Sequence, residues 1–149
     1  MGGQGDLEAR IRVLEDIEAI RKLKAKYWRT IDKKLWDENL QCFTEDFVLE
    51  ASGGTRVVGG RAFVEFLKGM FDRTTIVTTH QGHQAEIEIT SETTARAIWV
   101  LRDHIVDWDG KTEMRGRGHY EDEYVKENGA WKIRHTTLTY LLHDRTAHA

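Results

Sequence analysis

The segment from residue 79 to residue 89 carries the strongest candidate for acid–base chemistry, a histidine within a strand-like pattern. Its odd-numbered positions are Thr79, Gln81, His83, Ala85, Ile87 and Ile89. Successive side chains of a β-strand point to opposite faces, so this alternation predicts that His83 faces the core. His80 shares the other face with Glu86 and Glu88 and is expected to face outward.

An inward-facing His83 could act as a general base. The ordinary pKa of an imidazole, about 6.5, suits it to moving protons near neutral pH. A core histidine that hydrogen-bonds a backbone carbonyl would give the same alternation, so the pattern leaves both interpretations open.

The next strand-like segment adds a carboxylate. Asp103 has the same parity as the apolar residues Ala97, Trp99, Leu101 and Ile105. A carboxylate on an apolar face needs a partner or a function. The even positions are also partly apolar, so His104 is the alternative inward residue of this segment.

A tyrosine and an aspartate lie near the end of the first predicted helix. Apolar residues recur at spacings of three and four, at Val13, Ile17, Ile20, Leu23, Tyr27 and Ile31, which is typical of an amphipathic helix. The Tyr27 hydroxyl could enter a cavity or belong to an ordinary core residue. Asp32 could cap the helix or reach the imidazole of His83. His135 shares its parity with Trp131 and Ile133 and is a lesser candidate.

The elements that would position these residues fall into two groups. Periodicity predicts helices over residues 7–31, 35–43 and 61–71, and strands over 47–51, 56–58, 76–89, 95–108, 111–125 and 130–142. Asp109-Gly110 and Asn128-Gly129 are typical of hairpin turns. The order predicts an α+β fold, with helices on one face of a curved antiparallel sheet and a pocket between them. We expect a single domain over 1–149, with a flexible N-terminus of about 1–6 and a C-terminal tail of about 143–149.

Composition excludes several functional classes. The 22 Lys and Arg are interleaved with 25 Asp and Glu, for a net charge of −3, which argues against nucleic acid as a partner. Cys42 is the only cysteine, so an intrachain disulfide is excluded. No apolar run approaches the roughly 20 residues that span a bilayer, and we expect a cytoplasmic protein with no membrane partner. His80 and His83 would point to opposite faces, so no metal site is predicted. The sequence has no Gly-rich phosphate loop and no nucleophile elbow, and we expect no cofactor.

Four segments together resemble the SnoaL-like branch of the nuclear transport factor 2-like superfamily. They are KLKAKYWRTIDKKLW (22–36), THQGHQAEI (79–87), WVLRDHIVDWDG (99–110) and YEDEYVKENGAWKI (120–133). Within that branch, the chain is most similar to the bile acid 7α-dehydratases and more distantly to the scytalone dehydratases. The resemblance implies a cone-shaped curved antiparallel sheet, of the cystatin-like type, with three N-terminal helices that enclose a pocket.

The resemblance also implies an active site. The tyrosine of the first helix, the aspartate five residues later, the histidine of the first long strand and the acidic residue of the next strand correspond to Tyr27, Asp32, His83 and Asp103. Residues expected to bind substrate are His104, His135, Trp99 and Tyr140. Tyr140 stands where the family has an arginine, and the pocket tyrosine expected near Ala51 is missing.

The function implied is that of a cofactor-independent dehydratase acting on a hydrophobic, cyclic, hydroxylated small molecule. His83 would remove a proton from an activated carbon, Asp32 would orient the imidazole, Tyr27 would donate a hydrogen bond to the enolate oxygen, and Asp103 would contact a substrate hydroxyl. The alternatives are an isomerase or cyclase with the same pocket, and a noncatalytic binding protein or partner subunit. The outer sheet face, with Arg96, Arg102, Arg115 and Arg117, predicts a homodimer or homotrimer.

Overall fold

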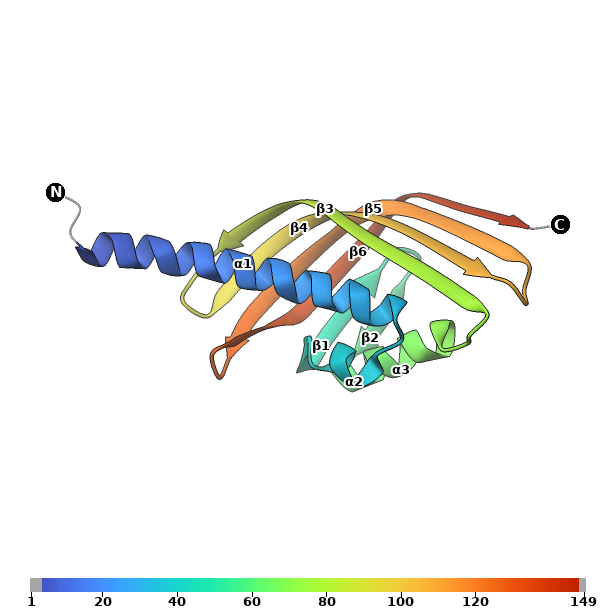
Figure 1. Ribbon diagram of the computed structural model, residues 1–149, viewed down its shortest axis with the longest axis horizontal. Helices are drawn as coiled ribbons and strands as arrows, with labels where there is room; N and C mark the ends of the chain where they lie inside the picture. Colours follow the sequence, from blue (N-terminus) through green and yellow to red (C-terminus); the bar gives the residue numbers. More distant parts are fainter. Residues whose placement is uncertain (1–3, 148–149) are drawn as a thin grey trace.

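Helices cover one face of a curved sheet in the computed structural model, which describes residues 4–147 (Figure 1). The elements in chain order are α1 (Gln4–Asp32), α2 (Trp36–Leu40), β1 (Phe43–Ala51), β2 (Thr55–Val58), α3 (Gly60–Phe71), β3 (Ile76–Ile89), β4 (Thr94–Asp107), β5 (Thr112–Glu127) and β6 (Ala130–Ala147). Over these residues the strands form a six-stranded sheet in the order β2-β1-β6-β5-β4-β3. The α+β architecture expected from the sequence is confirmed.

Several boundaries differ from the predictions. The strand β1 begins at Phe43, four residues early, and pairs in parallel with β6, whereas the other neighbouring strands pair antiparallel. The tail predicted at 143–149 is wrong up to Ala147, because β6 continues to pair with β5 as far as Thr112. The helix α1 already begins at Gln4, within the predicted flexible N-terminus. Residues 1–3 and 148–149 lie outside the described part.

One face of α1 packs against the concave side of the sheet. A buried stripe follows the helical period through Ile20, Lys24, Tyr27, Trp28 and Ile31, and Thr30 is buried as well. The first turns of α1 extend past the sheet and are exposed (Figure 1). Within residues 4–147, no helix is both long and apolar enough to cross a bilayer.

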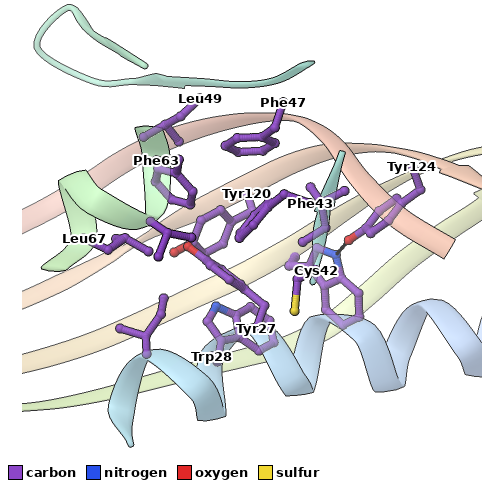
Figure 2. Packing of buried hydrophobic residues seen from close by; sticks show 14 of the residues in the cluster. Tyr27, Trp28, Cys42, Phe43, Phe47, Leu49, Phe63, Leu67, Tyr120 and Tyr124 are labelled. Carbon is purple, nitrogen blue, oxygen red and sulfur yellow. Dashed lines mark hydrogen bonds between the residues drawn. The ribbon is translucent and has the colours of Figure 1, made fainter. Parts of the chain in front are cut away.

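Aromatic rings fill the space between the helices and the sheet (Figure 2). The Phe43 ring lies 4.6 Å from that of Phe47 and 5.1 Å from that of Phe63, centroid to centroid, and Tyr27 meets Phe43 edge to face at 5.5 Å. Such offset and edge-to-face contacts are the favoured geometries of aromatic pairs. They hold the end of α1 against β1 and α3.

Cys42 lies in this core and is expected to be unreactive. Burial raises the pKa of its thiol to about 11, although the nearby charges of Lys26 and Arg29 oppose the shift. The thiolate is the reactive form. At pH 8 we therefore expect modification by an aromatic disulfide reagent to be slower than in the urea-unfolded chain by about two orders of magnitude or more. A comparable rate in the two states would contradict the burial of this thiol.

A β-bulge divides β3 into two halves. The pairing of β3 with β4 shifts register between His83 and Glu86, and Gln84 has a left-handed φ of 49°. A bulge inserts an extra residue into one strand, so the alternation of side chains changes phase across it. Before the bulge, the buried or half-buried positions are Ile76, Thr78, His80 and Gly82; after it they are Ala85, Ile87 and Ile89.

Candidate active site

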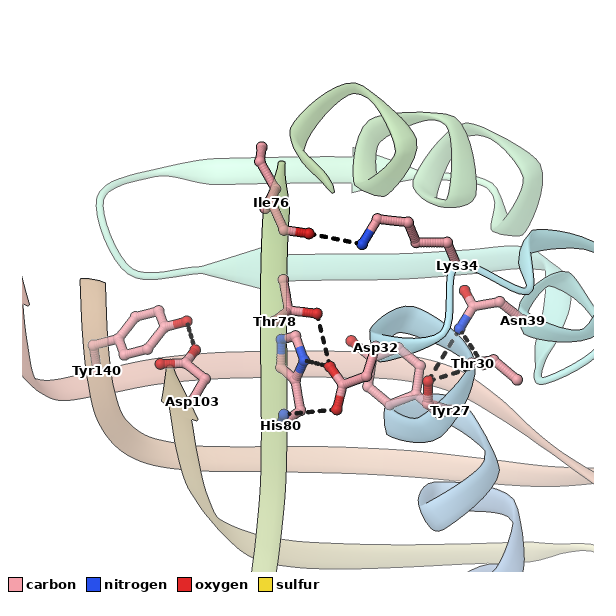
Figure 3. A network of polar contacts seen from close by, with 10 residues as sticks. All are labelled: Tyr27, Thr30, Asp32, Lys34, Asn39, Ile76, Thr78, His80, Asp103 and Tyr140. Carbon is pink, nitrogen blue, oxygen red and sulfur yellow. Dashed lines mark hydrogen bonds and ion pairs between the residues drawn. The ribbon is translucent and has the colours of Figure 1, made fainter. Parts of the chain in front are cut away.

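Asp32, the last residue of α1, accepts three hydrogen bonds from β3 (Figure 3). Its Oδ1 lies 2.7 Å from His80 Nδ1 and 2.8 Å from Thr78 Oγ1, and its Oδ2 lies 2.9 Å from the backbone nitrogen of His80. Thr78 and His80 are two residues apart on the strand, so both side chains point to the same face. The end of the helix and the first half of β3 are therefore fixed against each other at this carboxylate.

The imidazole of His80 is oriented for base chemistry. A carboxylate only accepts hydrogen bonds, so Nδ1 carries the proton in this contact, and in the neutral imidazole Nε2 is the nitrogen with the free lone pair. The His80 side chain is 6% exposed and that of Asp32 is 25% exposed, and the Phe71 ring lies 6.2 Å from the imidazole. The pair is thus largely desolvated, which strengthens its electrostatic interaction.

The predicted inward orientation of His83 is wrong. His83 is exposed and lies on the outer face of the sheet, in a hollow of about 470 Å³ that Val100, Arg117 and Leu141 also line. The odd-numbered positions Ala85, Ile87 and Ile89 face inward only after the bulge. Before the bulge the even-numbered positions face inward, so the prediction assigned the two histidines to the wrong faces. Ile76 and Thr78 were the signal that could have identified His80, because they have its parity.

Asp103 lies next to His80 on the inner face. The two residues are directly paired across β4 and β3, and Asp103 is 3% exposed. The Tyr140 hydroxyl donates to its Oδ2 at 2.6 Å, whereas its Oδ1 is buried and has no hydrogen-bond partner within residues 4–147. Burial and the charge of Asp103 together raise the pKa of Tyr140 far above its ordinary value. In Figure 3, His80 therefore lies between Asp32 on one side and the Asp103–Tyr140 pair on the other.

A glycine makes room for this second pair. Gly116 is directly paired with Asp103 across β4 and β5. A Cβ at this position would overlap the Asp103 carboxylate and the Tyr140 ring. Gly116 thus belongs to the site although it contributes no functional group, and its role could not be inferred before the strands were paired.

The other predicted residues lie away from the pair formed by His80 and Asp32, called the dyad below. Tyr27 is buried among aromatic rings, and its ring meets that of Tyr120 edge to face at 6.3 Å; burial, then the proximity of Tyr120, raises the pKa of Tyr27. The Trp99 indole is also buried, 5.5 Å from Trp28, and donates to the Tyr124 hydroxyl.

Two predicted substrate-binding histidines lie on the outer face. His104 contacts Glu113 at 2.7 Å. His135 contacts Glu50 at 3.3 Å and lines a hollow of about 680 Å³. Of the four residues expected to bind substrate, the structure brings only Tyr140 to the His80 site. In the part of the chain from 4 to 147, no three His, Cys, Asp or Glu side chains are grouped as a metal site requires.

Comparisons with other proteins define the fold. A family model described as a SnoaL-like domain matches residues 12–137. The crystal structure of a scytalone dehydratase candidate from Novosphingobium aromaticivorans is 23% identical, with a TM-score of 0.83 over 94% of this chain and 92% of that chain. An aromatic ring hydroxylase candidate from the same bacterium is 26% identical, with a TM-score of 0.81 over 89% and 94%.

A more distant neighbour is a hexachlorocyclohexane dehydrochlorinase from Novosphingobium barchaimii. It is 17% identical, with a TM-score of 0.81 over 94% of this chain and 97% of that chain. Further neighbours are described as having a cystatin-like fold. Identities this low indicate a shared fold, so the chemistry of this chain has to be argued from its own residues.

Proposed function

The chain belongs to the SnoaL-like domain family, and on that premise we propose that it is a cofactor-independent dehydratase of a hydrophobic, cyclic, hydroxylated substrate. The observation that carries the proposal is the contact of 2.7 Å between His80 Nδ1 and Asp32 Oδ1. A histidine oriented by a carboxylate is the usual arrangement of a general base, because the carboxylate fixes the tautomer and stabilises the imidazolium that forms.

In the proposed reaction, His80 Nε2 removes a proton from a carbon next to a carbonyl group. The electron pair of that C–H bond forms the new double bond as the C–O bond to the neighbouring hydroxyl breaks. The imidazolium returns its proton to the departing oxygen, so the products are an unsaturated carbonyl compound and water. Asp32 stays ionised throughout and holds Nδ1–H.

The Asp103–Tyr140 pair is proposed to orient the substrate hydroxyl. Asp103 Oδ1 is an acceptor with no partner within residues 4–147, and it lies on the strand next to His80. A buried acceptor of this kind favours a ligand that donates an O–H group. Tyr27 is buried against the rings of Phe43 and Tyr120, so we propose that it packs the core behind the site and does not contact the enolate oxygen.

We propose a neutral ring compound, steroid-like or aromatic polyketide-like, as the substrate. The predicted likeness to bile acid 7α-dehydratases would suggest a coenzyme A ester, but Tyr140 stands where an arginine is expected, and the tyrosine expected near Ala51 is missing. A tyrosine hydroxyl supplies no positive charge to an anionic group. Ile105 and Leu138, which pack against the core, provide apolar surface on the same strands as Asp103 and Tyr140.

The test is a panel of cyclic β-hydroxy ketones in deuterated buffer, followed by ultraviolet absorbance for the conjugated product and by NMR for exchange of the α-proton. Formation of the unsaturated product would support the dehydratase. Exchange without loss of water would overturn dehydration in favour of isomerase chemistry. Binding without either reaction would overturn the catalytic proposal.

The second candidate is a noncatalytic binding protein or partner subunit. The aromatic rings that fill the space between the helices and the sheet favour it, because a filled core leaves little room for a substrate. Such a protein would not need an imidazole held by a carboxylate, so ligand binding that survives the loss of the His80 side chain, in the absence of any turnover, would support this alternative.

We further propose that copies of the chain associate through the outer face of the sheet as a homodimer or homotrimer. Arg102 and Arg117 are directly paired across β4 and β5, and neither is in an ion pair within residues 4–147. Like charges in this position repel each other. Glu121 and Glu123 lie on the same face further along β5, and Ile98, which is 40% exposed, lies beside Glu121. The arginines of one copy can thus meet the glutamates of another.

Reversing the two arginines is expected to dissociate this assembly. Arg102→Glu/Arg117→Glu should elute as a monomer in size exclusion with light scattering, whereas the unmodified chain elutes as a dimer or trimer. The matched control is Arg12→Glu/Arg21→Glu on exposed positions of α1, which should leave the mass unchanged. A monomeric unmodified chain would contradict the proposed interface.

A further inference from the structure

A second buried polar contact joins α1 to the sheet, two helical turns before Asp32. Lys24 Nζ lies 2.7 Å from Asp122 Oδ2, and both side chains are 0% exposed. Lys24 belongs to the buried stripe of α1, between Ile20 and Trp28, and Asp122 is on the inner face of β5. This ion pair is separate from the dyad and from the Asp103–Tyr140 pair.

Aromatic rings surround the Lys24 ammonium, whose Nζ has the Asp122 ion pair but no well-aligned hydrogen bond within residues 4–147. Lys24 Nζ lies 3.8 Å from the ring centroid of Tyr120, 4.9 Å from that of Tyr27 and 5.2 Å from that of Trp28. Figure 2 shows these three rings crowded together between α1 and the sheet.

The carboxylate end is fixed as firmly. Asp122 also accepts the Tyr124 hydroxyl and Thr136 Oγ1, each at 2.7 Å. Asp122 is therefore fixed by hydrogen bonds within β5 and to β6. Because the carboxylate is fixed, the ion pair with Lys24 constrains the position of α1 on the sheet.

Stability alone is a weak reason for such a pair. Apolar residues of similar volume often replace a buried ion pair without loss of stability, and the best-supported use of a buried polar contact is to select one packing register. The other buried residues of this stripe, Ile20, Tyr27, Trp28 and Ile31, contact the sheet through apolar or aromatic surface that tolerates small shifts. Asp32, by contrast, must stay within hydrogen-bond distance of Thr78 and His80.

We propose that Lys24 and Asp122 are positioning residues, which fix the register of α1 on the sheet and thereby hold Asp32 against His80. A helix turned by one residue rotates by about 100°, which would carry Asp32 away from β3. The effect on the register of α1 follows from the contacts alone, and the effect on catalysis rests on the proposed dehydratase function.

The test is the Lys24→Met/Asp122→Asn variant, which removes both charges together and keeps the side-chain lengths. The readouts are two NMR signals of His80 in isotope-labelled protein: the Nδ1 proton held by Asp32, and the hydrogen exchange of the backbone N–H that donates to Asp32 Oδ2. We expect the variant to fold cooperatively, to lose the Nδ1 signal, and to exchange the His80 amide about tenfold faster or more.

Two matched variants make the result specific. Tyr124→Phe removes two hydrogen bonds of the same cluster without touching α1, and it should leave both His80 signals in place. Lys24→Gln/Asp122→Asn keeps an uncharged donor and acceptor between α1 and β5 and should restore them. If the methionine variant does not fold in buffer, the same spectra are recorded with trimethylamine N-oxide, which favours the compact state.

Retention of both His80 signals in Lys24→Met/Asp122→Asn would overturn the positioning role. Loss of the signals to the same extent in Tyr124→Phe would overturn it as well, because any weakening of the core would then suffice. These readouts need no substrate, so failure of the dehydratase assay leaves them unaffected. With a substrate in hand, kcat should fall about tenfold or more while KM changes little.

Discussion

Replacing His80 with glutamine is expected to lower kcat/KM for the proposed elimination by about two to four orders of magnitude. Glutamine keeps a polar side chain of similar reach, but its amide cannot take a proton from carbon. Asp32 would still accept hydrogen bonds from Thr78 and from the backbone of residue 80, so the contact between α1 and β3 persists. The measurement is steady-state turnover of an accepted substrate, with exchange of the α-proton in deuterated buffer as a second readout.

His83→Gln is the matched control. It changes the same residue type three positions along the same strand, but on the exposed outer face. Turnover should be unchanged, and both variants should unfold at urea concentrations close to that of the unmodified chain. A loss in His83→Gln that equals the loss in His80→Gln would contradict the assignment of the base to His80.

Replacing Lys24 alone with methionine is expected to destabilise the fold by about 3–5 kcal/mol, because the Asp122 carboxylate would stay buried without its cation. Burial lowers the pKa of Lys24, and the contact with Asp122 opposes that shift, so the charged form depends on this one partner. Urea unfolding followed by circular dichroism measures the free energy of unfolding.

Two comparisons separate this effect from a general cost of mutation. Lys24→Met/Asp122→Asn should recover most of the lost stability, since no uncompensated charge remains. Arg96→Met breaks the exposed pair with Glu88, and pairs of that kind contribute about 1 kcal/mol or less. If Lys24→Met costs no more than Arg96→Met, the pair is not desolvated in solution.

The helices and hairpins could be predicted because their local sequence patterns match the structure. The stripe from Ile20 to Ile31 has the helical period, and it is the face that α1 buries. The hairpin turn at Asn128-Gly129 has left-handed φ values at both residues, as its sequence predicts. The parallel pairing of β1 with β6 could not be predicted in the same way, because it joins residues about 90 positions apart.

The site was harder to predict because it depends on phase and on pairing between strands. Asp103 and Asp32 lie beside His80, and their residue types were enough to predict that both belong to the site. The choice between His80 and His83 depended on one bulged residue, Gln84, whose left-handed backbone has no clear sequence signal in a residue other than glycine, asparagine or aspartate. His104 and His135 face outward because of the way their strands pair with the neighbouring strands, which the sequence pattern alone does not reveal.

The bulge at Gln84 also makes β3 a strand of two independent parts. Residues 76–82 carry the contacts to Asp32, and residues 85–89 pack Ala85, Ile87 and Ile89 against the core. Deleting one residue at the bulge would leave the packing half in place and turn the other half over, so His83 and Gln81 would exchange faces with His80 and Thr78. The number of residues between 83 and 86 therefore determines which histidine faces the interior. Insertions or deletions in this segment would change the chemistry of a relative while leaving its core unchanged.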